Sequence, residues 1–255
     1  MSQPSPVRVV LHGGLGNQLF QLFYAKNLAM RRPGTPVHLH SELLQRYETA
    51  RDFELNCLVQ QNRLVSIQPI GRLCRLRLPK LAYRLTKQER EWNIPGVGLL
   101  VDGYFQTRQH YERFNRPQLL AVIDAWRSRL GLDVTPKPEG RQLVHIRLGD
   151  FFQSDHEAMQ YVAQRLQQLD PDIDVMSNQE NLVSRAIEAL GRSGRTRVII
   201  TRELDSWSLL RRMASYPKIQ TNGSTLAFWA ACLSAAALQT TDHSHQMTFR
   251  HLRPD

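Results

Sequence analysis

The stretch VRVVLHGGLGNQLFQ, residues 7–21, decides the fold class of this chain. Hydrophobic residues run into a turn that holds three glycines within four positions, and an amphipathic run follows. This order predicts a strand over Val7–Leu11, a tight turn, and a helix over Gln18–Met30, which Arg31-Arg32-Pro33-Gly34 ends. A second strand is predicted at Val37–His40. A strand, a helix and a parallel strand form a βαβ unit with a right-handed crossover.

The same alternation of strands and helices continues along the chain. Residues 41–95 give a less clear pattern, mostly helical or irregular, whereas Leu99–Asp102 predicts a strand and Gln118–Leu130 a helix. The elements expected in the second half are strands at Gln142–Ile146, Arg197–Thr201 and Lys218–Gln220, and helices at 157–169, 180–191, 203–214 and from Ser224 to about Leu238.

A linker divides these elements into two groups. The segment 131–140 carries Pro136 and Pro138 and two glycines, and the strand–helix pattern restarts directly after it. The sequence therefore predicts an α/β protein with two domains, 1–135 and 136–255, each built on a parallel sheet.

Composition places the chain among globular proteins. Of its 255 residues, 42% are hydrophobic, and no run approaches the roughly 18–20 apolar residues that cross a bilayer. The start, MSQPSPVRVV, lacks the basic and apolar regions of a signal peptide. Three scattered cysteines are too few for a disulfide framework or a zinc site. These features predict a reduced, cytoplasmic compartment.

The charge predicts an anionic partner. A net charge of +10 favours nucleic acid, a nucleotide sugar or a membrane surface. The segment 72–90 is the most basic part of the chain and carries leucines between its cations. Such a segment can lie on an anionic bilayer, as a peripheral contact at the inner face of the membrane. It can equally be a solvated helix face with its leucines on the core, and the sequence leaves both interpretations open.

The residues just after the strands are the candidates for function, because ligands of such folds bind at the carboxyl ends of strands. After Gln142–Ile146 comes HIRLGDFF. His145 and Arg147 lie on one side of the strand, Gly149 allows a sharp exit from the sheet, and Asp150 can fold back onto Arg147. A planar guanidinium grips phosphate oxygens bidentately. The cluster predicts a phosphate clamp, with a structural Arg–Asp pair as the alternative.

A second candidate follows the last predicted strand. In TNGSTLAFWAACLSAAA, residues 221–237, Asn222-Gly223 predicts a turn and Ser224 or Thr225 an N-cap before an alanine-rich helix. The N–H groups at a helix start, with two hydroxyls beside them, suit a phosphate. Plain helix capping needs the same residues.

Acidic residues at two places invite a ligand role. Glu203, which follows the strand ending at Thr201, could accept hydrogen bonds from guanine, or could simply be a first-turn glutamate favoured by the helix dipole. Asp172-Ile173-Asp174 has the spacing of a metal-binding pair, but it lies in a Pro-containing loop rather than after an apolar strand, so no metal is predicted there.

The opening glycines fit a dinucleotide fingerprint poorly. In GLGNQL, residues 14–19, a leucine stands where the third glycine is needed, and no acid closes the strand at Val37–His40. Asn17 and Gln18, at the start of the helix, could instead bond a sugar or a phosphate. A nicotinamide-dependent oxidoreductase would need a better glycine fingerprint than this one, and it is kept as the first alternative function. A nucleic-acid binder ranks below it, because no aromatic–basic module accompanies the charge.

With these residues in view, the chain resembles the α-1,2-fucosyltransferases, inverting, GDP-fucose-dependent enzymes of the glycosyltransferase family 11 type. Four motifs carry the resemblance, in order along the chain: GGLGNQLFQ at 13–21, GYFQTRQHY at 103–111, HIRLGDF at 145–151 and NGSTLAFWAA at 222–231. The chain differs from the family at Arg202, which stands where the first of two acids is common.

The resemblance implies a GT-B-like fold, in which two Rossmann-like α/β domains face a cleft. The first domain would bind most of the acceptor, an oligosaccharide or lipid-linked glycan, and the second would bind GDP-fucose. Fucose would pass with inversion to a sugar hydroxyl such as the 2-hydroxyl of a galactoside. No metal, no further cofactor and no nucleic acid is expected.

The motif match also implies roles for single residues. Arg147 would hold the GDP phosphates and support the leaving group. Glu203 is the candidate for guanine. No general base is evident, and Asp150, Asp155 and Glu157 are the candidates. The remaining implied positions are His145 and Asp150 beside the clamp, Ser224 and Thr225 at the phosphate, and Asn17 and Gln18 lining the cleft from the other domain.

Overall fold

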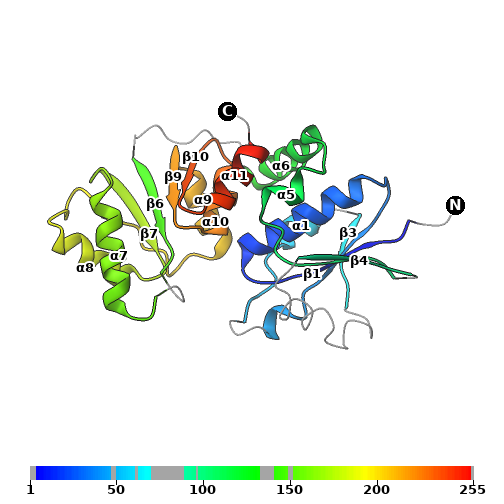
Figure 1. Cartoon of the computed structure of the whole chain (residues 1–255), viewed down its shortest axis with the longest axis horizontal. Helices are drawn as coiled ribbons and strands as arrows, with labels where there is room; N and C mark the ends of the chain where they lie inside the picture. The colour runs from blue at the N-terminus through cyan, green and yellow to red at the C-terminus, as the bar shows by residue number, and fades with distance from the viewer. Residues whose placement is uncertain are drawn as a thin grey trace. The chain divides into compact units, whose positions relative to one another are not determined.

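A computed structural model describes residues 4–46, 50–60, 63–69, 89–95, 97–132, 141–148 and 152–253. Contacts divide the chain into two compact units, Met1–Leu130 and Gly131–Asp255. Each unit is a sheet of mostly or wholly parallel strands flanked by helices (Figure 1), so the predicted α/β class with two Rossmann-like parts is confirmed.

Three predictions fall on residues that the structure does not describe. The domain boundary expected between residues 135 and 136 is one, Asp150 is the second, and the basic segment 72–90, apart from its last two residues, is the third. Within the described ranges, none of the helices combines the length and the apolar character that crossing a bilayer requires.

The sheet of the first unit has the order β3-β2-β1-β5-β4. Its first four members in that order are parallel, and β4 runs antiparallel to β5. Val10 pairs with His40 on one side and with Asp102 on the other, so the carboxyl ends of three strands are level. The strands are β1 (Val7–Val10), β2 (Val37–His40), β3 (Val65–Ile67), β4 (Arg90–Ile94) and β5 (Gly98–Asp102).

The helices of this unit include one that is buried on almost every side. In α1, thirteen of the sixteen residues are buried. It begins at Leu15, earlier than predicted, because the carbonyl of Gly14 already accepts the N–H groups of Asn17 and Gln18 at 2.9 and 3.1 Å. The helices are α1 (Leu15–Met30), the short η1 (Leu44–Arg46), α2 (Asn56–Val59), α5 (Arg108–Tyr111) and α6 (Arg116–Leu130).

The second unit is a fully parallel sheet of order β10-β9-β6-β7-β8. Helices α7 and α8 pack against one side of it, and α10 and α11 lie on the other (Figure 1). Its strands are β6 (Gln142–Ile146), β7 (Ile173–Ser177), β8 (Arg197–Val198), β9 (Lys218–Thr221) and β10 (Ala237–Thr240). Its helices are α7 (Asp155–Gln167), α8 (Glu180–Ala189), α9 (Ser206–Ala214), α10 (Thr225–Cys232) and α11 (His243–Leu252).

The end of the chain differs from the sequence prediction. The helix expected to reach about Leu238 ends at Cys232, because Ala237–Thr240 pairs along β9 and completes the sheet. Helix propensity of the alanines is overridden by this tertiary pairing. A last helix, α11, then begins at the cap Asp242, whose carboxylate accepts the N–H of His245 at 3.1 Å. His245 is buried, and its ring packs against that of Phe228.

Strand β7 is the other correction. The stretch that holds Asp172-Ile173-Asp174 was expected to be a loop, but it leads into a fully buried strand. Asp174 is completely buried, and its carboxylate accepts hydrogen bonds from Arg141 Nε at 2.7 Å, Arg197 Nε at 3.0 Å and the Tyr216 hydroxyl at 2.8 Å. Burial alone would raise the pKa of Asp174, but these donors outweigh it and hold the pKa below its usual range.

Replacing Asp174 tests this buried network. Asp174→Asn removes the charge that two arginines share, so the free energy of unfolding of the second unit should fall by about 3 kcal/mol at neutral pH. The pKa of Asp174 is lower in the folded than in the unfolded chain. Its contribution to the free energy of unfolding is therefore complete above the unfolded pKa of about 4, and it is lost as pH falls through the folded pKa. Denaturant melts at several pH values measure both effects.

Asp172 supplies the matched control. Its carboxylate pairs with Arg195, but both side chains are more than half exposed. Asp172→Asn should therefore change stability far less than Asp174→Asn. Equal losses in the two variants would contradict the role given to Asp174.

Candidate functional site

The order of the second sheet reverses next to β6. From β6 the chain adds β7 and β8 on one side, and then β9 and β10 on the other. Ligands of open parallel sheets bind at the carboxyl ends of the strands where this reversal occurs. The segments that leave β6 and β9 at this point carry Arg147 and residues 222–225, and the structure thus brings two of the predicted motifs together.

Two asparagines fix the backbone that carries Arg147. The amide of Asn222 accepts the N–H of Arg147 at 3.0 Å and donates to its carbonyl at 2.8 Å. On the other side, Asn178 accepts the N–H of Leu148 at 2.9 Å. The sequence assigned Asn222 only to a turn and gave Asn178 no role. An asparagine directly after a strand was the signal that could have revealed both.

His145 lies beside Arg147 and is uncharged at neutral pH. Val144, Ile146 and Leu148 belong to the core under α7 and α8, so the alternating positions His145 and Arg147 lie on the other side of the strand. His145 is only 9% exposed, and burial, with the charge of Arg147 as the smaller cause, lowers its pKa to about 4. Among the described residues its Nδ1 has no hydrogen-bond partner.

The start of α10 faces the same strand end. Ser224 is the N-cap, its hydroxyl accepts the N–H of Ala227 at 3.3 Å, and it is buried. Thr225 is the first helical residue and is half-buried. Gly223 has φ +98°, a backbone conformation that side chains rarely adopt. The capping role of Ser224 is therefore observed, and a phosphate contact at Thr225 remains a prediction.

Two predicted acids lie at the surface. Glu203 is exposed in the turn between β8 and α9, and it is Glu180 that accepts the N–H groups of Thr201 and Arg202 there. Strand β8 ends at Val198, earlier than the predicted Thr201. Asp155 is exposed at the first turn of α7, whose buried residues pack on the side of the sheet opposite His145. The roles assigned to Glu203 and Asp155 remain predictions.

The first sheet reverses next to β1, between β1 and β5. His12 follows β1, Asp102 ends β5, and the ring Nε2 of His12 hydrogen-bonds the Asp102 carboxylate. Their side chains are 2% and 1% exposed. The sequence prediction passed over both residues. A polar residue at the end of each of two neighbouring hydrophobic strands is the signal that was available.

Gln21 of α1 ties the two strand ends together. Its side-chain oxygen accepts the N–H of His12 at 3.0 Å, and its amide donates to the carbonyl of Gly103 at 2.9 Å. Gln21 is fully buried. Gln21 therefore bonds the backbone at His12 and directly after Asp102, and these two hydrogen bonds restrain the strand ends that carry the pair.

Asn17 and Gln18, both expected to contact a sugar, differ in their surroundings. Gln18 is fully buried. Its amide donates to the carbonyls of Gly13 and Asp52, and its oxygen accepts the N–H of Glu54, so the side chain stabilises the turn and is not available to a ligand. Asn17 is half-buried, and its oxygen accepts the amide of Gln106 at 2.9 Å. A Cβ on Gly13, where φ is +70°, would lie 2.2 Å from the Asn17 amide nitrogen.

The segment after β5 is held in an unusual conformation. Phe105 has φ 53°, which non-glycine residues adopt rarely and often at functional sites. Its N–H donates to Glu89, its carbonyl accepts the Tyr111 hydroxyl at 2.5 Å, and its ring stacks on Tyr24. The conformation places Gln106 against Asn17 and thereby joins the first two sequence motifs.

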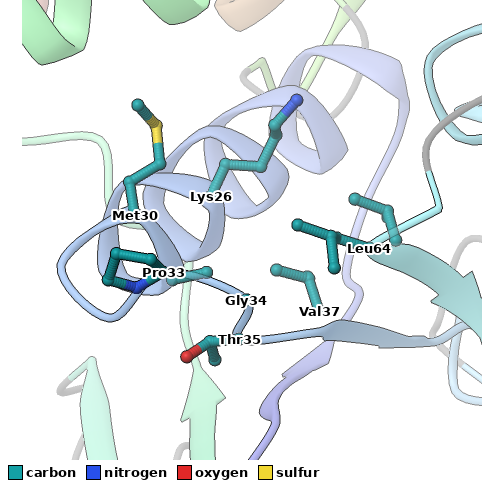
Figure 2. Close-up of a pocket in the computed structure, with 9 residues that line it drawn as sticks. Lys26, Met30, Pro33, Gly34, Thr35, Val37 and Leu64 are labelled. Carbon is teal, nitrogen blue, oxygen red and sulfur yellow. The ribbon is translucent and has the colours of Figure 1, made fainter. Parts of the chain in front are cut away.

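Two pockets of the described residues lie elsewhere. One of about 280 Å³ lies between the end of α1 and the start of β2, where Figure 2 shows Met30, Val37 and Leu64 around it. Another of about 570 Å³ lies beside α9, lined by Ile199 and Leu204. Neither includes a residue of the two strand ends just described. No group of three metal-ligating side chains occurs within the residues that the structure describes.

No protein-family model matches the chain, and no curated protein matches it in sequence. Solved structures resemble it in fold. The α-1,6-fucosyltransferase NodZ, co-crystallised with GDP, is 12% identical with a TM-score of 0.47, covering 90% of this chain and 93% of that one. The E. coli heptosyltransferase WaaC with ADP is 12% identical with a TM-score of 0.49, covering 95% and 90%. A family 9 glycosyl transferase from Veillonella parvula is 10% identical with a TM-score of 0.43, covering 97% and 89%. The likeness concerns the general fold.

Removing the Asn222 amide should loosen the second strand end. Asn222→Ala breaks two hydrogen bonds to the Arg147 backbone, and each is worth about 1 kcal/mol. We expect the free energy of unfolding of the second unit to fall by about 2 kcal/mol. Asn178→Ala, which breaks the single bond to Leu148, is the comparison and should cost about half as much. Identical losses, or none, would show that these amides do not hold the segment.

His145 should make stability depend on pH. The unfolded chain binds a proton at a pKa of about 6.5, whereas the folded pKa is about 4. Stability is therefore complete above the unfolded pKa and falls with pH between the two values. From about pH 7.5 to about pH 5 this contribution is about 2 kcal/mol.

Comparison of variants isolates that contribution. In His145→Gln, the loss of stability over this pH range should be smaller than in the wild type, whereas in His243→Gln, where the side chain is exposed, it should be unchanged. Denaturant titrations at both pH values measure it. An unaltered pH dependence in His145→Gln would contradict the neutral, buried state of this ring.

Proposed function

We propose that the chain is a glycosyltransferase that moves L-fucose from GDP-fucose to a sugar hydroxyl, the 2-hydroxyl of a galactoside, with inversion, in the synthesis of a glycan or an O-antigen-type polysaccharide. The observation that carries the proposal is the pair of hydrogen bonds through which Asn222, beside α10, holds the backbone of Arg147. They join the two motifs expected to bind phosphate at the place where the sheet order reverses. The four-motif resemblance supplies the donor and the acceptor.

The donor chemistry follows from charge. As the bond between the sugar C1 and the phosphate oxygen breaks, negative charge gathers on the β-phosphate, and stabilising such charge is usually the largest catalytic contribution. Arg147 offers a fork that matches phosphate oxygens, and the first N–H groups of α10 have no acceptor within their own helix. Because His145 stays neutral, the positive charge at the end of β6 is that of Arg147.

The acceptor is assigned to the first unit. Asn17 and Gln106 present side-chain amides at its strand end, and Tyr104 adds a half-buried aromatic ring next to His12. Amides that both donate and accept suit sugar hydroxyls, and an aromatic ring suits the apolar face of a sugar. Gln18, which is committed to the backbone, is left out of this assignment.

We also propose that transfer needs no metal, because Arg147 and the start of α10 neutralise the diphosphate. Chelator should therefore leave the rate unchanged. The expected acceptor, a lipid-linked glycan, agrees with a peripheral membrane contact through 72–90, which remains a prediction, as do the cytoplasmic location and the absence of a nucleic-acid partner.

A donor screen tests the proposed function. Hydrolysis and transfer are followed with GDP-fucose, GDP-mannose and UDP-sugars, with and without chelator, and binding of GDP and NAD⁺ by tryptophan fluorescence. We expect turnover of GDP-fucose in preference to the others. Turnover of GDP-mannose alone would support a GDP-sugar transferase but reject fucose as the donor sugar. Arg202 would then be the first residue to test as the cause. Binding of NAD⁺ but not GDP would favour an oxidoreductase.

Arg147 should be indispensable for turnover. Arg147→Ala removes the cation that meets the developing phosphate charge, and the loss of one such donor costs about 10²–10³ in rate. Arg147→Lys keeps the positive charge but loses the planar guanidinium fork, so its turnover rate should lie between those of the wild type and Arg147→Ala. Initial rates with GDP-fucose measure both variants. Arg250→Ala on α11, an exposed cation, is the control and should keep its activity. Wild-type turnover in Arg147→Ala would reject the phosphate clamp.

A further inference from the structure

The buried pair His12–Asp102 has no explanation in core packing. Ionisable side chains are rarely placed in the interior without a use, because removing them from water costs several kcal/mol. Here both lie at the strand ends where the first sheet reverses. In addition, the second carboxylate oxygen of Asp102, Oδ2, is buried and has no hydrogen-bond partner among the residues that the structure describes.

The geometry fixes the state of the imidazole. A carboxylate can only accept a hydrogen bond, so the proton between the two groups belongs to Nε2 of His12. With that proton on Nε2, the proton of a substrate hydroxyl would be taken up at Nδ1. A carboxylate that holds one nitrogen protonated, and that stabilises the imidazolium formed when the other gains a proton, is the arrangement of a general base in many enzymes.

We propose that His12 is the general base of the transfer reaction and that Asp102 is its positioning residue. The inference rests on the proposed function and supplies the base that the sequence left unassigned. The acceptor oxygen forms a bond to C1 of the sugar, the bond from C1 to the phosphate oxygen breaks with its electron pair leaving on GDP, and the hydroxyl proton passes to Nδ1 of His12. Asp102 balances the charge of the imidazolium.

The surroundings of the ring suit this task. Gln21 holds the backbone of His12, and the ring of Tyr104 lies edge-on to that of His12 at 6.0 Å between centroids. The other titratable group at this edge is His40, at the end of β2, whose pKa is lowered mainly by its burial. Asp102 and Tyr104 lie against the His12 ring, and His40 ends the neighbouring strand.

The burial of His12, which is 1% exposed, also fits a transferase. Water admitted to the base would compete with the acceptor and hydrolyse the donor, so excluding it protects the sugar. Tyr104 is half-buried and directly follows Gly103. Its ring lies against that of His12, so an acceptor sugar would meet Tyr104 next to the base.

His12→Gln is the decisive variant, since its amide can still donate to Asp102 but cannot take a proton. We expect kcat for transfer to fall by about 10²–10⁴, while the GDP dissociation constant and the melting temperature stay near wild type. The wild-type kcat–pH profile should decline on the acid side, and this decline should be absent in His12→Gln. Added imidazole should restore part of the transfer in His12→Ala.

An exposed histidine gives the control. His243 begins α11 in the second unit and its side chain is exposed, so His243→Gln should keep both kcat and its pH profile. Should His12→Gln fail to fold, Asp102→Asn in the same assays decides, because a loss of kcat with an altered acid limb and unchanged GDP binding is expected.

The outcomes separate the two proposals. Transfer at the wild-type rate in His12→Gln, or an unchanged acid limb in both variants, overturns the general base and leaves the proposed function intact. A loss of activity that matches a loss of thermal stability, without rescue by imidazole, shows a purely structural pair and also overturns it. Absence of transfer from every donor by the wild type rejects the proposed function, and the base with it.

Discussion

Both units depend on one constraint, the reversal of strand order beside a central parallel strand. When neighbouring strands add on opposite sides of β1 or β6, the segments leaving them diverge at the carboxyl edge and expose their ends to a ligand. In the second unit the diverging segments are joined through Asn222 and the backbone of Arg147. In the first they are joined through His12 and Asp102. The side chains that could take part in a reaction lie at these two places.

The two strand ends are electrostatically unlike, and under the proposed function each would serve a different part of the transfer. The end of β6 offers a cation next to a histidine that burial keeps neutral, together with the start of α10. It suits an anionic leaving group. The end of β1 offers a histidine bonded to a carboxylate, with amides close by. It suits a neutral hydroxyl that must lose a proton.

Local patterns in the sequence predicted the alternation of strands and helices, the exact bounds of Val37–His40 and Gln142–Ile146, and the place of Arg147 at a strand end. They failed where tertiary pairing decides. β10 is a strand only because β9 lies beside it, and β7 was hidden by Asp174, whose charge is neutralised by arginines from elsewhere in the chain. The partner of His12 is likewise 90 positions away, beyond the reach of spacing rules.

The central claim is that a guanosine diphosphate binds at the end of β6. Mapping of backbone amide resonances during titration with GDP tests it most directly. We expect the shifts to concentrate on Arg147, Leu148 and residues 222–225, with little change at Asp174, which lies near the start of β7. Shifts confined to the pocket beside α9, or the absence of any shift at saturating GDP, would contradict it.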